Sequence, residues 1–374
     1  MTKTLSSSLS IFIVNLILLL SKFSTIEARD RDRHVIKFRS PGLYPEGLTW
    51  DPASQHFIVA ALRRGTFHSI SDAGVTETLT LTLTSSASNF PSNPTILGLA
   101  VDHRRNRLLA AVNTAESPYL AAFSLQRTAI NLLFLSPLPT TSPTSAVAND
   151  VAVDPYGDAY VTNSGENFIW KISLNGTASI LSNSSLFTHY PVDQTSPYNY
   201  CGLNGVVYIA GKNHLLVVQS NTGKMFKVDA VDGTTNSVIL PTELTVADGI
   251  AVREDGVVFV VSMNDAWMMK SDDSWAQGVV IDKIALEREG FPTSVTVGGG
   301  GRVYVIYGYV EEGMKVISQG EEREGFRIEE IASKKESGGD NVWAFVMVGL
   351  GLVYFLFWRF QMGQLVKNLD KKHS

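Results

Sequence analysis

Four residues with oxygen-bearing side chains occupy one position of a recurring pattern. Glu46, Asn149, Asn204 and Asp248 each precede a small or acidic residue and a short apolar run. If the chain brings them together, the two carboxylates repel unless one is protonated or a cation lies between them. Carboxylate and amide oxygens without His or Cys select a hard ion, and a loose ring of oxygens suits Ca²⁺ better than Mg²⁺. The pattern therefore predicts one Ca²⁺ site, with water or substrate oxygens as further ligands. Such an open metal position suits Lewis-acid hydrolysis.

The alternative is that these residues serve turns. Asn-Asp, Asn-Gly and Asp-Gly are common turn dipeptides, so a single match has little meaning. Four matches at one repeat position favour the metal site.

The elements that must position these residues are short strands in a repeat. Each copy has a small residue, alternating apolar residues, a turn and a second apolar run, and the starts lie 44 to 55 residues apart. This period predicts an all-β fold, a six-bladed β-propeller over residues 29–333, with the strand at 35–38 closing the ring. An irregular pair of β-sandwiches is the alternative. The copies begin at Gly47, Gly98, Asp150, Gly205, Gly249 and Ser294.

Equivalent positions at the starts of innermost strands form a ring around the propeller axis. In the second and sixth copies, the position of the four candidate ligands is occupied by Leu97 and Thr293. The ring is therefore expected to have four ligands and two non-ligands.

Composition excludes several classes of protein. The 374 residues include 31 Lys and Arg and 36 Asp and Glu, a net charge of −5. This balance argues against a nucleic-acid partner, which requires a basic surface. The single cysteine, Cys201, excludes an intrachain disulfide framework and a CxxC site. We expect Cys201 to be a small buried residue rather than a reactive thiol.

The first residues have the pattern of a signal peptide. An apolar run at 10–20 follows Lys3, and no acidic residue precedes Glu27. This run is short for a membrane span, so residues 1–28 are interpreted as a signal peptide. An uncleaved signal anchor is the alternative. Two sequons, at Asn175 and Asn183, are candidate glycosylation sites in the lumenal body.

The last residues predict a membrane anchor. After a linker at 334–341, residues 342–358 carry no charge and lie between aromatic residues, which predicts a transmembrane helix. Basic residues in the tail, 359–374, place that tail in the cytosol. Lys371 and Lys372 resemble a dilysine retrieval signal, which predicts coat-protein partners and an endoplasmic reticulum membrane location. A buried core helix, and a basic tail meeting anionic lipid, are the alternatives.

The body resembles the senescence marker protein and gluconolactonase family, whose relatives include diisopropyl fluorophosphatase, paraoxonases and strictosidine synthases. The resemblance implies a catalytic calcium held by Glu46, Asn149, Asn204 and Asp248. It further implies that Asp248 is the nucleophile or general base. The matching segments are PEGLTWDP at 45–52, ANDVAVDPYGDAYVTNSG at 148–165, LNGVVYIAGKNHLLVVQSNTGKMFKVD at 203–229, ADGIAVREDGVVFVVS at 247–262 and PTSVTVGGGGRVYVIYG at 292–308.

The sequence departs from its relatives at several positions. Val147 stands where gluconolactonase-type members have Arg, and Ala251 stands where the fluorophosphatase has an Asp for a second calcium. We therefore expect at most one calcium of the catalytic type, and the resemblance does not extend to the Arg that accompanies sugar-lactone recognition in those members. No His of the body falls at a catalytic position of these relatives. The tyrosines before the fourth copy, Tyr190, Tyr198 and Tyr200, are candidates for an apolar pocket wall.

Three functions remain open on the sequence alone. The first is a calcium-dependent hydrolase that cleaves a small-molecule lactone, ester or organophosphate-like substrate. The second is a non-catalytic, calcium-stabilised propeller that acts as a lumenal interaction scaffold. The third is a strictosidine-synthase-like enzyme, which would use a pocket Glu and no metal chemistry.

Overall fold

The computed structural model describes residues 33–82, 90–126, 129–142, 145–192, 194–195, 198–315, 322–333 and 340–370. The chain divides into two units, Met1–His34 and Val35–Ser374. The predicted signal peptide and the two terminal lysines, Lys371 and Lys372, lie outside the described residues, as does most of the predicted linker.

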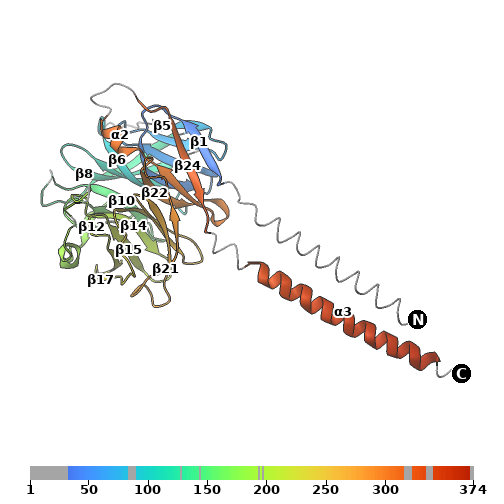
Figure 1. Ribbon diagram of the computed structural model, residues 1–374. Helices are drawn as coiled ribbons and strands as arrows, with labels where there is room; N and C mark the ends of the chain where they lie inside the picture. Colours follow the sequence, from blue (N-terminus) through green and yellow to red (C-terminus); the bar gives the residue numbers. More distant parts are fainter. Residues whose placement is uncertain are drawn as a thin grey trace. The chain divides into compact units, whose positions relative to one another are not determined.

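Short strands, most of them paired antiparallel, are the main elements of the second unit (Figure 1). They are β1 (Val35–Arg39), β2 (Pro45–Asp51), β3 (His56–Ala61), β4 (Phe67–Ile70), β5 (Thr76–Thr82), β6 (Thr95–Asp102), β7 (Arg107–Asn113), β8 (Pro118–Leu125), β9 (Ala129–Pro137), β10 (Ala148–Val153), β11 (Ala159–Asn163), β12 (Phe168–Ile172), β13 (Ala178–Ser182), β14 (Leu203–Ile209), β15 (His214–Gln219), β16 (Met225–Asp229), β17 (Thr235–Ser237), β18 (Ala247–Val252), β19 (Val258–Ser262), β20 (Asp265–Lys270), β21 (Val279–Ala285), β22 (Pro292–Val297), β23 (Val303–Tyr307) and β24 (Gly325–Ile331). The described helical elements are η1 (Ser185–Thr188), η2 (Gly299–Gly301), α2 (Val310–Lys315) and α3 (Asp340–Asp370).

The strands pair in consecutive sets of four. Four sheets have four strands each, and one sheet of eight strands joins β2–β5 to β6–β9 through a parallel pairing of β5 with β9. The set that contains β22, β23 and β24 is completed by β1, so the two ends of the repeat region share one sheet. This is the all-β, propeller-like arrangement that the repeat predicts, including closure by the strand at 35–38.

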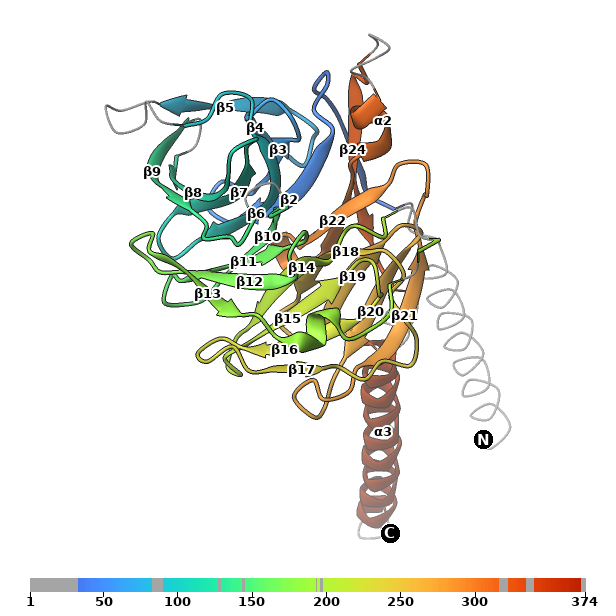
Figure 2. The same cartoon turned by 90° about the vertical axis from the view of Figure 1, so that its left-hand side faces the viewer.

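The first strand of every set faces the first strands of its two neighbours. Contacts run from β2 to β6, β10, β14, β18 and β22 and return to β2, which closes a ring. Figure 2 shows β10, β14, β18 and β22 converging in the middle of the sheets. The starts of these strands are therefore the place where the predicted ligands can meet.

A hydrophobic cluster fills each interval between neighbouring sets. Alternating apolar residues on the two faces of each sheet supply these clusters, because successive side chains of a strand point to opposite faces. Large, fully buried members include Phe57, Phe123, Trp170, Phe226, Met269 and Tyr307, one for each of the six clusters.

Close approach of the first strands requires glycine at two points. A Cβ on Gly47 would lie 2.3 Å from the carbonyl oxygen of Leu97, and one on Gly205 would lie 2.3 Å from that of Asp248. No real Cβ contact is that short, so the missing side chain lets these strands touch. The small residue of the repeat thus brings the ring together.

The C-terminal helix, α3, covers the predicted span at 342–358 and continues to Asp370. In the part of the chain that the structure describes, no helix is both long enough and apolar enough to cross a membrane. The prediction of a transmembrane helix at 342–358 therefore has no support.

Candidate functional site

The four predicted ligands occupy one structural position. Glu46, Asn149, Asn204 and Asp248 are each the second residue of the first strand of a set, in β2, β10, β14 and β18. In each of these strands the register with the next strand shifts at this residue and the one after it. Such a bulge re-aims the side chains that it contains. A register shift also occurs in β6, at Leu97 and Gly98, and in β22, at Thr293 alone.

Serine hydroxyls fix the two amides. Ser164 accepts a hydrogen bond of 2.7 Å from Asn149 Nδ2 and donates one of 2.6 Å to the Leu203 carbonyl. Ser220 does the same for Asn204, accepting from Nδ2 at 3.0 Å and donating to the Ala247 carbonyl at 2.6 Å. With its nitrogen engaged, each amide keeps its Oδ1 oxygen as an acceptor. The repeat contained this signal, since both serines follow the second strand of their set.

The carboxylates form a buried cluster. Asp248 is buried, whereas Glu46 keeps partial exposure. Burial raises the pKa of Glu46 well above its usual range, and the charges of Asp248 and Asp150 raise it further. Burial also raises the pKa of Asp248, followed by the charge of Asp150, while a hydrogen bond from Asn204 lowers it. Among the described residues, no cationic side chain contributes to either pKa shift. The negative charge of the cluster is therefore not balanced by a positive side chain.

Asp150 is a third acid that the sequence interpretation did not select. It occupies the position of Gly47, Gly98, Gly205 and Gly249 in the other copies, which is the signal that identifies it. Its carboxylate accepts hydrogen bonds from the backbone N–H of Val151 at 2.8 Å and of Val206 at 2.9 Å. Burial raises the pKa of Asp150 to about 7, against the effect of these two bonds. Asp150 therefore joins β10 to β14 and adds negative charge to the cluster.

These residues fit a hard cation by the chemistry of the donor set. Two carboxylates and two oriented amide oxygens are ligands of the kind that Ca²⁺ takes. In the described part of the chain, no three His, Cys, Asp or Glu side chains form a metal-binding group on their own. A site here accordingly depends on the amide oxygens of Asn149 and Asn204.

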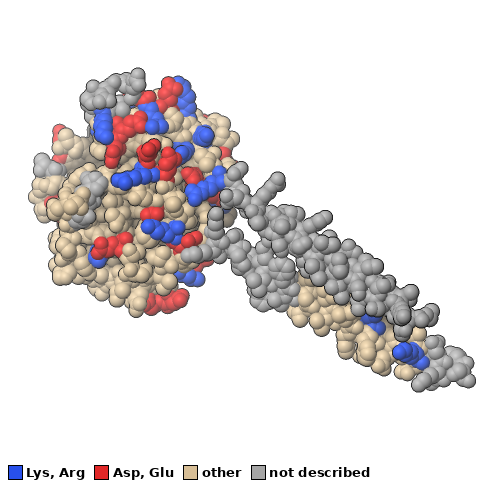
Figure 3. Space-filling view, in the orientation of Figure 1, with Lys and Arg blue, Asp and Glu red and all other residues tan. Residues whose placement is uncertain are grey.

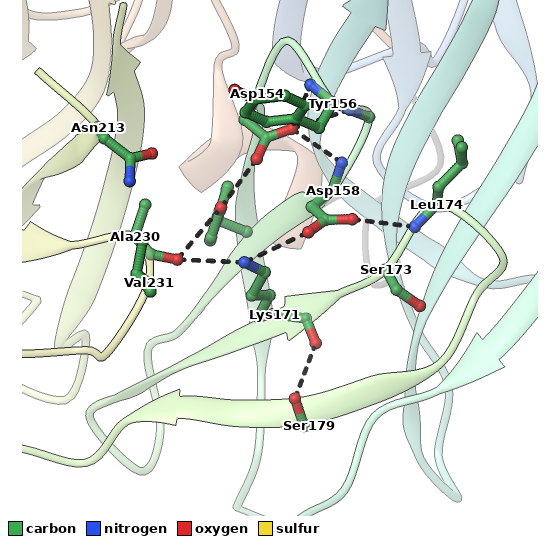
Figure 4. Close-up of polar contacts among 12 residues, drawn as sticks. Asp154, Tyr156, Asp158, Lys171, Ser173, Leu174, Ser179, Asn213, Ala230 and Val231 are labelled. Carbon is green, nitrogen blue, oxygen red and sulfur yellow. Dashed lines mark hydrogen bonds and ion pairs between the residues drawn. The ribbon is translucent and has the colours of Figure 1, made fainter. Parts of the chain in front are cut away.

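Asp154 and Asp158, outside the cluster, have a structural role (Figure 4). Asp154 accepts hydrogen bonds from the backbone N–H of Tyr156, Gly157 and Asp158 at 2.8 to 3.0 Å, and from the Tyr160 hydroxyl at 3.0 Å. Asp158 pairs with Lys171 at 3.3 Å. Asp154 thus has four hydrogen-bond donors and Asp158 has a cationic partner, whereas burial and neighbouring carboxylates raise the pKa of Glu46 and Asp248.

Cys201 lies beside the cluster. Its sulfur is 3.8 Å from Asn204 Nδ2. Burial raises the pKa of the thiol to about 11, and the charges of Asp248 and Glu46 add to the shift. At neutral pH the residue is therefore a neutral thiol, and the thiolate is the reactive form.

Other expected features lie away from the cluster. His56 contacts Ser69 of β4, and His68 contacts Thr66 and Thr78. A cavity of about 190 Å³ is lined by residues that include Tyr44, and one of about 410 Å³ by residues that include Phe326. Neither is lined by Glu46, Asn149, Asn204 or Asp248. Acidic and basic side chains intermingle on the face that Figure 3 shows.

Comparisons with known proteins agree with this architecture. The family model described as SMP-30/Gluconolactonase/LRE-like region matches residues 44–306. A search of the curated proteins found no match. Among solved structures, the major Malassezia sympodialis allergen Mala s 1 is similar at 16% identity and a TM-score of 0.65, over 80% of this chain and 96% of the allergen.

Two enzymes are also similar in structure. A gluconolactonase from Xanthomonas campestris has 13% identity and a TM-score of 0.54, over 82% of this chain and 93% of its own. Luciferin-regenerating enzyme has 12% identity and a TM-score of 0.54, over 80% of this chain and 96% of its own. At these identities the likeness concerns the fold.

Proposed function

Because the chain belongs to the SMP-30/gluconolactonase/LRE-like family, we propose that it is a calcium-dependent hydrolase of a lactone, ester or organophosphate-like substrate. The family and its structural neighbours support a lactonase-type hydrolase or a related propeller protein. The observation that supports calcium dependence is the group of carboxyl side chains of Glu46, Asp150 and Asp248. Burial raises the pKa of all three, and no cationic side chain among the described residues offsets their charge.

The proposed architecture is a six-bladed propeller. Each half of the eight-stranded sheet counts as one blade, which gives six blades with the other four sheets. The calcium ligands would then come from blades 1, 3, 4 and 5, and Leu97 and Thr293 would occupy the equivalent positions of blades 2 and 6.

In this proposal Glu46, Asn149, Asn204 and Asp248 hold one Ca²⁺. When bound, the ion supplies a Lewis acid that polarises a carbonyl or phosphoryl oxygen. Ser164 and Ser220 orient the amide oxygens before substrate arrives, which lowers the cost of organising the site. Asp248 acts as nucleophile or as the base that takes a proton from water, and both roles require the ionised carboxylate.

Hydrolysis tests this proposal directly. The purified chain is assayed with a lactone, an aryl ester and a phosphotriester, in calcium and in a chelator. We expect turnover of at least one class in calcium, its loss in chelator, and a decrease of about 10³-fold or more in Asp248→Asn.

The matched control is Asp154→Asn, which alters a buried aspartate outside the cluster and leaves turnover unchanged. Calcium binding without turnover of any substrate class would contradict the hydrolase and favour the interaction scaffold.

A further inference from the structure

A hydrogen bond from Tyr198 joins the segment before the fourth set of strands to the sixth set. Tyr198 belongs to the segment that leads into β14, and its hydroxyl donates a hydrogen bond of 3.0 Å to Glu311 Oε1 in α2. Its ring lies 5.0 Å from that of Phe291, the residue before β22. The contact therefore joins two sets that are not neighbours in the ring.

The backbone around Tyr198 is tied down on its own side. The N–H of Cys201 donates to the Tyr198 carbonyl at 3.0 Å, and the N–H of Asn221 donates to the Cys201 carbonyl at 3.0 Å. Asn221 Nδ2 donates to the Asn199 carbonyl at 3.2 Å. The hydroxyl, the ring and the backbone of Tyr198 therefore each have a contact that fixes the position of the ring.

That place is close to the proposed calcium ligands. Asp248 is among the charges that act on Tyr198, and Cys201, three residues on, is acted on by Asp248 and Glu46 and touches Asn204. Tyr200 extends the aromatic surface, with its ring 6.3 Å from that of Tyr198 and two-thirds of its side chain exposed. Tyr198, Tyr200 and Phe291 are here called the aromatic wall.

Several carboxylates lie around the wall. Glu46, Asp150 and Asp248 lie in the cluster, and Glu311 accepts from Tyr198. Among the described residues of the sixth set, Lys315 pairs with Glu311 at 3.6 Å and Arg323 pairs with Glu312 at 2.8 Å. Val147 supplies no charge at the position discussed above. With no cation bound, a negatively charged substrate group would therefore find little attraction here.

We propose that the aromatic wall makes this site select substrates that carry an aromatic ring, with Tyr198 as the residue that determines this specificity. The inference rests on the proposed function and names its substrate class, an aryl ester or aryl-substituted lactone. Ring-to-ring contacts of this kind contribute about 0.5–1.5 kcal/mol beyond area burial, or about 2- to 10-fold in affinity.

Binding of amides that the enzyme does not need to cleave tests the inference separately from catalysis. Acetanilide is neutral and aromatic, N-cyclohexylacetamide is neutral without an aromatic ring, and 4-acetamidobenzoate is aromatic and anionic. Their dissociation constants for the calcium-loaded full chain are measured by ligand-observed NMR titration. We expect acetanilide to bind about 2- to 10-fold more tightly than the cyclohexyl amide. When the titrations are repeated in chelator, where no bound cation offsets the acidic cluster, we expect the anion to bind most weakly.

Variants assign the selectivity to Tyr198. Tyr198→Phe keeps the ring and is expected to keep the preference for acetanilide, whereas Tyr198→Leu keeps apolar bulk and is expected to lose it. Tyr156→Ala is the control, because this exposed tyrosine belongs to the turn between β10 and β11 that Figure 4 shows and is not part of the wall. Equal affinity for the aromatic and cyclohexyl amides, an unchanged preference in Tyr198→Leu, or no binding of any amide would overturn the inference.

The hydrolytic arm separates the two proposals. Phenyl acetate and cyclohexyl acetate are compared by kcat and KM in the same variants. If the amides are discriminated but neither ester is cleaved in calcium, the hydrolase proposal fails and the selective wall stands. If both esters are cleaved and Tyr198→Leu leaves the ratio of their KM values unchanged, the wall fails and the hydrolase stands.

Discussion

Glu46 and Asp248 are acids whose environment disfavours their charged form. Burial and the charges of other carboxylates raise the pKa of both groups. A buried charge without a partner destabilises the fold, so such a cluster persists where it has a use other than stability. By contrast, Asp154 has four hydrogen-bond donors and contributes to stability directly.

Replacing Asp248 is therefore expected to stabilise the protein when no metal is present. In chelator at pH 7.5, Asp248→Asn removes one repelling charge and should raise the free energy of unfolding by about 1 kcal/mol or more, or Tm by about 2–4 °C. Thermal unfolding measures the change. Asp154→Asn should instead lower Tm because it disturbs donors that the carboxylate satisfies. A lower Tm for Asp248→Asn in chelator would contradict the electrostatic account.

Asp150 predicts an unusual pH dependence. Its pKa is about 7 in the fold against a usual value of 3.8, so the folded protein holds a proton that the unfolded chain has released. Stability of the metal-free protein should then fall as the pH rises from about 4 to 7, by about 4 kcal/mol in total from this group. Urea unfolding in chelator across this range measures the fall. Asp150→Asn should show a smaller decrease, and an identical decrease would refute this role.

At the scale of elements, the register shift at the start of each first strand explains how a small repeat makes a site. The bulge directs the second residue of the strand, and the following glycine lets neighbouring strands touch. Where Asp150 replaces that glycine, its carboxylate accepts the Val206 N–H of the next set. One repeat position thus sets both the packing and the chemistry.

The same position shows how far sequence can lead. The repeat was sufficient to predict the closing strand and the shared position of Glu46, Asn149, Asn204 and Asp248. It also contained a signal for Asp150, an acid where four other copies have Gly, but the sequence does not show that this side chain is buried beside the other acids. The bridge from Tyr198 to Glu311 was also beyond prediction, since it joins residues 113 positions apart in irregular segments.

Gly47→Ala tests the close approach of the first strands. The added Cβ would lie 2.3 Å from the Leu97 carbonyl oxygen, so the strands must separate. We expect a loss of about 1–3 kcal/mol in the free energy of unfolding. Gly325→Ala in β24 is the matched control, because its Cβ would approach nothing closer than 4.0 Å. Equal losses in the two variants, measured by urea unfolding, would argue against a packing role for Gly47.

At the scale of the whole molecule, the described residues include a closed ring of first strands, with a hydrophobic cluster in each interval. The shared sheet of β1 and β24 joins the two ends of the repeat region. Closure places residues from distant parts of the chain around one axis. The chemistry of the site therefore depends on the whole ring rather than on any single set.

The predicted signal peptide implies entry into the secretory pathway, which N-glycosylation of the body can test. Asn175 and Asn183 are both exposed, so their sequons are accessible to glycosylation. Expressed in a eukaryotic host, the protein should shift on a gel after glycosidase treatment, and Asn175→Gln and Asn183→Gln should each remove part of the shift. No shift in the unaltered protein would contradict lumenal exposure of the body.

Calorimetric titration of the purified, metal-free chain with Ca²⁺ tests the central claim most directly. We predict one binding site in the unaltered protein and in Asp154→Asn, and at least about 100-fold weaker binding in Asp248→Asn and Glu46→Gln, since each removes a charged ligand. The absence of binding in the unaltered protein, or unchanged affinity in both ring variants, would contradict the assignment of a calcium site to this ring.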